Sequence, residues 1–319
     1  MVKLMMNYLS LFSGIGGFEL GIRKSRNGEK LKCISYSEID KNAISIYSRH
    51  FPKHHNLGDV RTIRTDELPN FDLLVGGFPC QSFSNSGNKQ GFDDTRGTLF
   101  FEIARILKDC QPKYFLLENV RGLLSNNDGH TFKRILQILA KMGYDVEWQL
   151  LNSKDFGTAH YRERVFLKGY FRERCGREIL HNPLFSRCFN SRLVNPYRSE
   201  DPNRFLKIRE TTKKGYKEAY PYDGVLLNRA RRKIAKGIVR EAYCGALQTS
   251  KIWGVVMPNL RVRYLTPLEC ERLQGFDDNW TKFGKDGEEI SDSQRYKCIG
   301  NAVTVPVIKH IFDHWELKE

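Results

Sequence analysis

The chain has 319 residues, of which 40% are hydrophobic and 28% charged, a composition typical of a globular protein with a sizeable core. No apolar run approaches the roughly 18 residues that a membrane-spanning helix needs, and Met1–Asn7 leads into a strand-like segment without the apolar stretch of a signal peptide. We therefore expect a cytoplasmic protein that does not enter a membrane. Its eight cysteines form no Cys-x-x-Cys pair and have no histidines at zinc-binding spacing, so neither a disulfide framework nor a metal site is expected.

Positive charge is concentrated in one part of the chain. The 52 basic and 37 acidic side chains give a formal net charge of +15, and residues 170–264 alone hold 21 basic and 8 acidic residues, a net +13. Basic groups that neutralise phosphates release condensed counterions, so such a segment favours binding to nucleic acid. The charge by itself is also compatible with a solvated basic surface.

Residues 1–169 alternate strand-like with helix-like segments. The strand-like runs are Tyr8–Ser13, Leu31–Ile39, Phe71–Phe78, Tyr114–Val120, Val146–Asn152 and Val165–Tyr170. Two intervening segments carry apolar residues at helical spacing: Phe100, Ile103, Ala104 and Leu107 in the first, and Phe132, Ile135, Leu136 and Leu139 in the second. Strands that alternate with helices of this length predict βαβ crossovers and an α/β fold with a doubly wound, mostly parallel sheet.

The regular pattern is lost between about Phe171 and Leu260, a stretch rich in Arg, Lys, Asn, Pro and Tyr. It returns at Thr266, where Pro267 and the capping-box residue Glu269 indicate the start of a helix. The chain ends in a predicted amphipathic helix whose apolar face carries Val303, Val307, Ile308, Ile311, Phe312 and Trp315. We predict a smaller basic domain, residues 170–260, inserted into a larger domain formed by residues 1–169 and 261–319.

A glycine-rich segment, Leu9–Phe18, joins the first predicted strand to a helix and lets a ligand approach the backbone closely. A dinucleotide fingerprint would need glycine at position 19, which is Glu19, so an NAD-type oxidoreductase is disfavoured. Glu38 ends the second strand, where a carboxylate can meet ribose hydroxyls. Asp59 follows the next helix, within reach of an adenine amine. Either acid can instead be an ordinary turn or cap residue.

Cys80 lies in the sequence Pro79-Cys80-Gln81, at the end of an apolar strand. Ligands of open α/β sheets bind beyond the carboxyl ends of the strands, so the cysteine is expected on a loop that faces the ligand. A lone cysteine is more often inert packing. Here the preceding proline and the polar loop of residues 81–97 favour a thiol presented for reaction.

Glu118 ends another buried strand, where an ionised carboxylate is costly unless it is paired or protonated. It can equally be a capping acid of the following turn. Arg162 and Arg164 enter the strand Val165–Tyr170, and alternate residues of a strand share one face. Both guanidinium groups can therefore point into one cleft.

In order and at suitable spacing, these segments resemble the DNA (cytosine-5) methyltransferases. The resemblance covers about 1–169 and 261–319, and it is carried by Phe12-Ser13-Gly14, Pro79-Cys80-Gln81, Glu118-Asn119-Val120, Arg162-x-Arg164, Arg263–Cys270 and Gly300-Asn301. The basic insert lies where that family keeps its target-recognition domain. Two departures are visible: His160 stands where the family usually has glutamine, and Ala302 stands where serine is common.

The resemblance implies a fold of the S-adenosylmethionine-dependent methyltransferase type and methylation of carbon 5 of a flipped-out cytosine in double-stranded DNA. It also implies S-adenosyl-L-methionine as cofactor, and a monomer that serves a restriction-modification or anti-restriction system. The expected catalytic residues are Cys80 as the nucleophile, Glu118 at ring nitrogen 3, Arg162 at the ring carbonyl oxygen and Arg164 in support. The expected cofactor-binding residues are Phe12, Gly14, Gly16, Glu38, Asp59, Val60 and Asn301. The expected DNA-binding residues are Gln81, Ser82, Ser84, Lys89, Arg96, Arg231, Arg232 and Lys233.

Two further alternatives share parts of this pattern. The tRNA-modifying branch of cytosine-5 methyltransferases carries a Cys-Phe-Thr signature shortly before the segment that starts at Arg263. Here Cys188-Phe189 is followed by Asn190 and lies early in the insert, which disfavours that branch. A catalytically silent DNA-binding protein is disfavoured because Cys80, Glu118 and Arg162 are all present.

Overall fold

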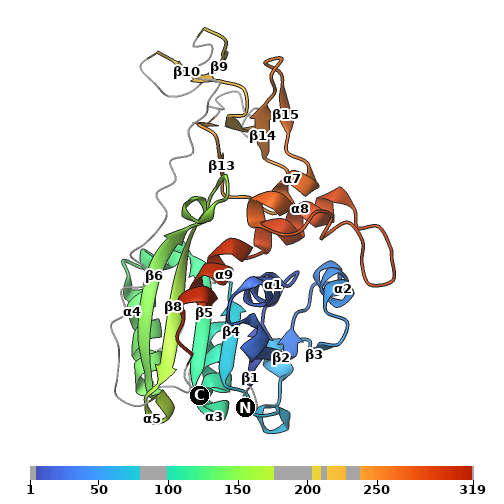
Figure 1. Ribbon diagram of the computed structural model, residues 1–319. Coiled ribbons are helices and arrows are strands. Elements are labelled where there is room, and N and C mark those ends of the chain that lie inside the picture. Colours follow the sequence, from blue (N-terminus) through green and yellow to red (C-terminus); the bar gives the residue numbers. More distant parts are fainter. Residues whose placement is uncertain (1–4, 80–98, 176–202, 210–213, 228–237, 318–319) are drawn as a thin grey trace. The chain divides into compact units, whose positions relative to one another are not determined.

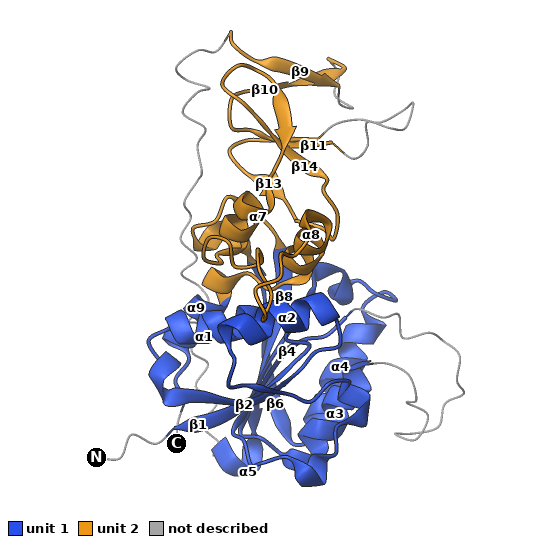
Figure 2. Cartoon of the chain, turned by 90° about the vertical axis from the view of Figure 1, so that its right-hand side faces the viewer, with its two compact units in different colours: residues 1–151, 163–187, 308–319 blue, residues 152–162, 188–307 orange. Residues whose placement is uncertain are grey.

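A computed structural model describes residues 5–79, 99–175, 203–209, 214–227 and 238–317 (Figure 1). The chain divides into two compact units, coloured separately in Figure 2. The first unit comprises residues 1–151, 163–187 and 308–319, and the second comprises residues 152–162 and 188–307. Each unit is built around its own sheet.

The first unit contains a seven-stranded sheet with the strand order β3-β2-β1-β4-β5-β8-β6. Neighbours from β3 to β5 pair in parallel, whereas β8 runs antiparallel to β5. The strands are β1 (Met6–Leu11), β2 (Leu31–Ser37), β3 (His55–Asn56), β4 (Leu73–Gly77), β5 (Tyr114–Val120), β6 (Tyr144–Asn152) and β8 (Glu163–Phe171). The order reverses between β1 and β4, and ligands of open α/β sheets bind at such a switch point.

Helices cover both faces of this sheet, with α3 and α4 on one face and α1 and residues 308–314 of α9 on the other (Figure 2). The helices are α1 (Gly17–Lys24), α2 (Lys41–His50), α3 (Leu99–Cys110), α4 (His130–Lys141), α5 (Arg172–Cys175) and α9 (Val305–His314). Short 3-10 turns are η1 (Gly28–Lys30), η2 (Val60–Thr62), η3 (Thr65–Glu67) and η5 (Arg121–Leu124). The predicted apolar stripes of α3 and α4 are buried against the strands, which explains why both segments are helical.

The second unit holds a four-stranded antiparallel sheet of order β12-β11-β14-β15, together with the small pairs β9–β10 and β7–β13. Its strands are β7 (His160–Tyr161), β9 (Leu206–Arg209), β10 (Tyr216–Ala219), β11 (Gly224–Leu226), β12 (Val239–Arg240), β13 (Cys244–Gly245), β14 (Trp253–Val256) and β15 (Val262–Tyr264). Its helices are α7 (Pro267–Gln274) and α8 (Asp292–Asn301), with the 3-10 turn η6 (Ser153–Phe156). Thr266 caps α7 and Glu269 completes the capping box, as the sequence predicts.

All six strand-like runs of the first 170 residues are strands, so the predicted α/β sheet of mostly parallel strands is confirmed. The predicted domain boundaries stay a prediction, and the compact units of the structure divide the chain differently. The second unit takes in residues 152–162 and 261–307 as well as most of 170–260. The physical reason is a set of buried hydrogen bonds from Arg162 and Gln274 that tie these segments together, a pattern that composition does not reveal. Among the described helices, none has the length and apolar character needed to cross a lipid bilayer.

Candidate active site

The turn after β1 has the backbone that the glycine-rich segment predicts. Phe12 adopts a left-handed conformation with φ of 53°, an unusual state for a residue with a side chain. Gly16 has φ of 86°, and a Cβ atom there would lie 2.6 Å from the ring of Phe51. The turn is therefore held tightly against the side chain that follows α2, and position 16 admits only glycine.

Glu38 lies one residue beyond β2, at the same edge of the sheet. Its carboxylate accepts hydrogen bonds from three main-chain N–H groups, those of Gly14 at 2.9 Å, Ile39 at 2.8 Å and Asp40 at 2.9 Å. The group is half-buried, so it is oriented by the backbone and still open to a ligand. The glycine turn after β1 and the acid after β2 are thus joined by a hydrogen bond.

Asp59 and Val60 lie next to this structure. Asp59 caps η2 and forms a salt bridge with Arg61, which holds the pKa of the Asp59 carboxyl below its ordinary value. Val60 is buried in the hydrophobic core. Gly58, which precedes Asp59, has open space where a Cβ atom would be. Gly58, Asp59 and Val60 thus leave room for the edge of a ligand beside the turn after β1. The carboxylate of Asp59 is, however, paired with Arg61.

Glu118 is at the carboxyl end of β5, opposite Gly77 of β4. Its Oε1 atom forms a salt bridge of 2.9 Å with Nε of Arg164, and the two side chains are 12% and 17% exposed. A Cβ atom at Gly77 would lie 3.0 Å from Oε2 of Glu118, so the glycine leaves room for the carboxylate. The predicted link between the acid of β5 and the start of β8 is therefore made by Arg164.

Asn119 connects the ends of β5 and β4. Its buried side-chain amide donates a hydrogen bond of 3.0 Å to the main-chain oxygen of Phe78, and its Oδ1 accepts from the N–H of Val120. The chain then continues through Pro79 to Cys80. Cys80 itself lies outside the described residues, as do the predicted DNA contacts Gln81, Ser82, Ser84, Lys89, Arg96, Arg231, Arg232 and Lys233.

Arg162 belongs to the second unit and is buried there. Its terminal nitrogens donate to three main-chain oxygens, Nη1 to Leu247 at 3.3 Å and to Gly300 at 3.1 Å, and Nη2 to Ala302 at 2.9 Å. This arrangement suits an anchoring group better than the expected contact with a ring carbonyl oxygen. Asn301, the last residue of α8, belongs to the same unit and has an exposed side chain.

Three residues of this region carry no role in the sequence-based prediction. Asn56 accepts from the N–H groups of Glu38 and Gly58, and its amide donates to the oxygen of Glu38. It therefore fixes the spacing of the two predicted ligand-binding acids. Asn119 supports the chain before Cys80, and Ile39 is 66% exposed directly after Glu38. Of these three residues, Ile39 alone is indicated by the sequence, because it is an isolated apolar residue between Glu38 and Asp40.

Comparisons with known proteins agree with this arrangement. The family model for C-5 cytosine-specific DNA methylase matches residues 6–316. The chain is 38% identical to the Type II methyltransferase M1.ScrFI of Lactococcus lactis subsp. cremoris, over 95% of this chain and 76% of that protein. It is 37% identical to the Type II methyltransferase M.NgoBI of Neisseria gonorrhoeae, over 96% of this chain and 91% of that protein.

Solved structures share the fold. A putative DNA modification methyltransferase encoded within an Escherichia coli prophage superposes with a TM-score of 0.67 at 20% identity, covering 97% of each chain. The Dnmt2 methyltransferase of Schizosaccharomyces pombe also gives a TM-score of 0.67, at 18% identity and with 97% of each chain covered. The family match over residues 6–316 and the relatives at 37–38% identity show that the chain belongs to the C-5 cytosine-specific DNA methylases and is a DNA (cytosine-5) methyltransferase.

Proposed function

We propose that the protein transfers a methyl group from S-adenosyl-L-methionine to carbon 5 of a cytosine flipped out of a specific duplex DNA sequence. The observation that carries the proposal is the ion pair between Glu118 and Arg164 at the end of β5. It lies opposite Gly77, three residues before Cys80 in the sequence, so an acid and a guanidinium meet at the edge of the sheet where the chain leads from β4 towards Cys80. That set of groups suits addition to a pyrimidine ring.

The residues around the turn after β1 fit the proposed cofactor. The space beside Gly14 is open where a side chain would otherwise project, and the oriented carboxylate of Glu38 can accept hydrogen bonds from ribose hydroxyls. The exposed side chain of Ile39 offers an apolar surface for the adenine ring. Asp59, Val60 and Asn301 are proposed to contact the adenine edge and the amino acid end. S-adenosylmethionine supplies an electrophilic methyl group on a sulfonium.

Cys80 is proposed to supply the covalent step. Its thiolate bonds to carbon 6 of the cytosine, and the ring electrons so released make carbon 5 nucleophilic. Carbon 5 then forms a bond to the methyl group as the methyl–sulfonium bond breaks. Loss of the proton from carbon 5 to a base restores the ring double bond and expels the Cys80 thiolate. One difficult displacement thus becomes two easier steps.

Glu118 is proposed to stabilise the charge that addition leaves on the ring, by a hydrogen bond or a proton at ring nitrogen 3. Arg164 acts on Glu118, because its guanidinium holds the Oε1 atom and is itself anchored on the main-chain oxygen of Glu163. The carboxyl group is thereby oriented before the base arrives. Orientation of this kind contributes to rate because it removes a search over side-chain conformations.

The base must leave the duplex to reach these groups, at a cost of a few kcal/mol. We propose that the polar loop of residues 81–97, with Ser82, Ser84, Lys89 and Arg96, closes behind the flipped base. Arg231, Arg232 and Lys233 are proposed to neutralise phosphates. The enzyme is proposed to act as a monomer on DNA in the prokaryotic cytoplasm. It is proposed to serve either a restriction-modification system or an anti-restriction system.

Transfer of a labelled methyl group from S-adenosylmethionine to unmethylated plasmid DNA tests the proposal, with bisulfite sequencing to identify the modified base. We expect 5-methylcytosine at one recurrent sequence. Methylation of tRNA but not of plasmid would assign the enzyme to the RNA branch. Binding of DNA without any methyl transfer, and without thermal stabilisation by S-adenosylmethionine, would leave only a silent DNA-binding protein.

A further inference from the structure

Leu247 is held on both sides by buried polar side chains of the second unit. Its main-chain N–H donates to Nε2 of His160 at 3.0 Å, and its main-chain oxygen accepts from Nη1 of Arg162 at 3.3 Å. His160 is fully buried in β7, which pairs with β13, and Arg162, the residue directly after β7, is 3% exposed. Because Nε2 of His160 accepts a hydrogen bond, its ring is neutral with the proton on Nδ1.

The same arginine fixes a second segment against Leu247. Its terminal nitrogens also reach the main-chain oxygens of Gly300 and Ala302, and Gln274 donates to the oxygen of Ala302 as well. A Cβ atom at Gly300 would lie 2.2 Å from the main-chain oxygen of Gln248, so the two backbones are in direct contact there. The conformation at residues 247–248 is therefore determined from several directions at once.

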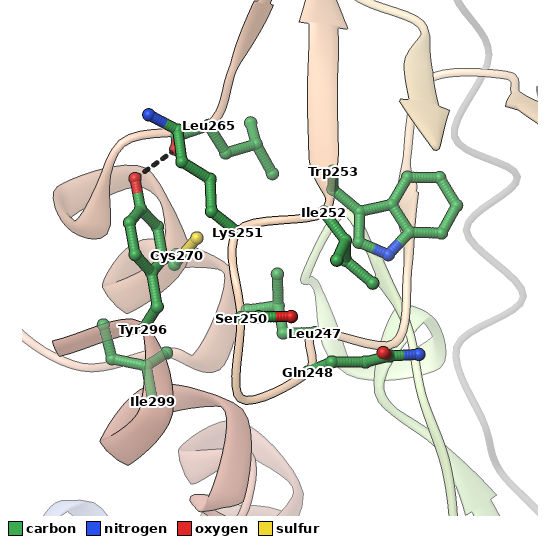
Figure 3. Close-up of a pocket in the computed structure, with 10 residues that line it drawn as sticks. All are labelled: Leu247, Gln248, Ser250, Lys251, Ile252, Trp253, Leu265, Cys270, Tyr296 and Ile299. Carbon is green, nitrogen blue, oxygen red and sulfur yellow. Dashed lines mark hydrogen bonds between the residues drawn. The ribbon is translucent and has the colours of Figure 1, made fainter. Parts of the chain in front are cut away.

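Four exposed residues follow this anchored point: Gln248, Thr249, Ser250 and Lys251. They carry an amide, two hydroxyls and an ammonium group, which are hydrogen-bond donors to phosphate oxygens. In Figure 3, Gln248, Ser250 and Lys251 border a hollow whose other side includes Leu265, Cys270 and Tyr296. The ammonium of Lys251 lies 4.8 Å from the ring of Tyr264 and 6.0 Å from that of Tyr296, and these cation–π contacts favour that direction of the side chain.

We infer that His160 and Arg162 are positioning residues that hold the run Gln248–Lys251 in one backbone conformation for contact with the DNA phosphates. The inference rests on the proposed DNA methylation. It replaces the expected contact of Arg162 with a ring carbonyl oxygen by an action through the main chain of Leu247. It also explains why a histidine can stand where related enzymes usually have glutamine, because both side chains can accept the N–H of Leu247.

Rigidity is what such a run gains from its anchors. A mobile run of four polar residues would lose conformational entropy on binding, whereas a run already held pays less of that cost. The run begins directly after the anchored Leu247 and is exposed, so the anchors act on a segment whose donors face solvent. The two observations together give the inference its test: changes at the anchor and changes on the run must affect the same step.

The first experiment compares two substitutions of His160 in the full-length protein. His160→Gln keeps an acceptor for the N–H of Leu247, and His160→Leu removes it. Steady-state methylation of unmethylated plasmid should give His160→Gln a KM for DNA within about twofold of the wild type. For His160→Leu we expect a KM for DNA raised about tenfold, with kcat and the KM for S-adenosylmethionine little changed, as expected when a contact made equally in the ground state and the transition state is removed. A loss in kcat of the same size for both variants would overturn the positioning role.

The second experiment avoids any risk to folding because it changes only exposed residues. Lys251→Gln should weaken binding to a short labelled duplex of mixed sequence and lower the slope of log K against log salt by about 0.9, the value for one neutralised phosphate. Ser250→Ala should weaken binding without changing the slope. Lys285→Gln is the matched control, since Lys285 is an exposed lysine of the same unit but lies in an acidic turn. It should change neither quantity.

Equal slopes for Lys251→Gln and the wild type would overturn the inference, and so would a slope that falls as much for Lys285→Gln as for Lys251→Gln. Failure of the proposed function gives a different result, because then the wild type itself would not methylate the plasmid. The two ideas are therefore judged by separate measurements.

Discussion

The side-chain amide of Asn119 donates a hydrogen bond to the main-chain oxygen of Phe78 across 3.0 Å. This hydrogen bond joins the carboxyl ends of β5 and β4, two residues before Cys80. It ties the position of the proposed nucleophile to the strand that carries Glu118. A buried amide thus joins the end of the strand that carries Glu118 to the end of β4, from which the chain leads to Cys80.

Replacement of Asn119 by alanine should therefore reduce catalysis more than folding. Loss of the amide leaves the oxygen of Phe78 unpaired, at a cost of about 1–3 kcal/mol, and frees the chain that leads to Cys80. A misplaced nucleophile should lower kcat by about tenfold to hundredfold while the affinity for S-adenosylmethionine stays near that of the wild type. Steady-state kinetics and cofactor titration measure the two effects separately.

Asn27 supplies the matched control in the same unit. Its side-chain amide also donates to main-chain oxygens, those of Phe312 and Trp315, at a distance in sequence from every proposed catalytic residue. Asn27→Ala should lower the unfolding midpoint without changing kcat. If Asn119→Ala affected the two quantities in the same way as Asn27→Ala, the amide of Asn119 would be structural only.

Glu118→Gln should lower kcat by far more than it weakens cofactor binding, because its proposed contribution falls in the addition step. Arg164→Lys should cause a smaller loss, since an ammonium keeps the charge beside Glu118 but not the planar donor geometry. Single-turnover methylation with saturating DNA measures both. Parallel losses of turnover and cofactor affinity in Glu118→Gln would make the residue part of the scaffold.

The strands of the sheet could be predicted from the sequence because each is a short apolar run, and such a run is recognised from neighbouring residues alone. Each of the six runs in the first 170 residues had to be covered, and each forms a strand whose ends differ from the predicted ends by at most two residues. The cap at Thr266 and Glu269 is local in the same way. The strands β7, β12 and β13 are only two residues long, and no periodicity can indicate them.

The site was predictable where a motif names a residue and unpredictable where a partner lies far along the chain. Glu118 and Arg164 were named, and they are paired. The hydrogen bond from Arg162 to Ala302 spans 140 positions, and nothing near Arg162 in the sequence indicates it. The extent of the second compact unit follows such long-range hydrogen bonds rather than the distribution of charge, so composition does not indicate it.

DNA binding should depend strongly on salt because the excess positive charge is concentrated in residues 170–264. Charge reversal at Arg231, Arg232 and Lys233 should weaken binding and reduce the slope of log K against log salt, by about 0.9 for each phosphate that these side chains no longer neutralise. Fluorescence anisotropy across a salt series measures the slope. An unchanged slope would mean that these three residues face solvent.

A duplex with 5-fluorocytosine at the target should trap the enzyme on Cys80. Fluorine at carbon 5 cannot leave as a proton does, so elimination stalls with the thiolate still bonded to carbon 6. The adduct should resist denaturant and form only when S-adenosylmethionine is present, and peptide mapping should locate it. Burial raises the pKa of the Cys33, Cys110, Cys175, Cys244 and Cys270 thiols, which disfavours reaction at any of them. An adduct on one of these five would refute the role of Cys80.

Glu19 should make the stability of the protein depend on pH. Its carboxyl group is buried in α1, and burial raises the pKa of Glu19 from 4.5 to about 7, while the neighbouring hydroxyls of Ser10 and Tyr47 offset only part of this rise. Between these values the folded state holds a proton that the unfolded state has lost. The free energy of unfolding should therefore fall as pH rises, by about 1.4 kcal/mol per unit and about 3 kcal/mol in all, and level off above the folded-state pKa.

Glu19→Gln keeps the shape of the side chain and removes the proton equilibrium, so it isolates this contribution. Urea unfolding of the two proteins should give similar stabilities near the lower pKa and a variant that is progressively more stable above it. Glu29→Gln, a change at an exposed glutamate of η1, should show no such divergence. The difference between wild type and Glu19→Gln cancels the other titrating groups, because these are common to both proteins. A stability difference between the two proteins that stays constant with pH would mean that the pKa of Glu19 is the same in the folded and unfolded chains. Burial of Glu19 would then contribute nothing to the pH dependence of stability.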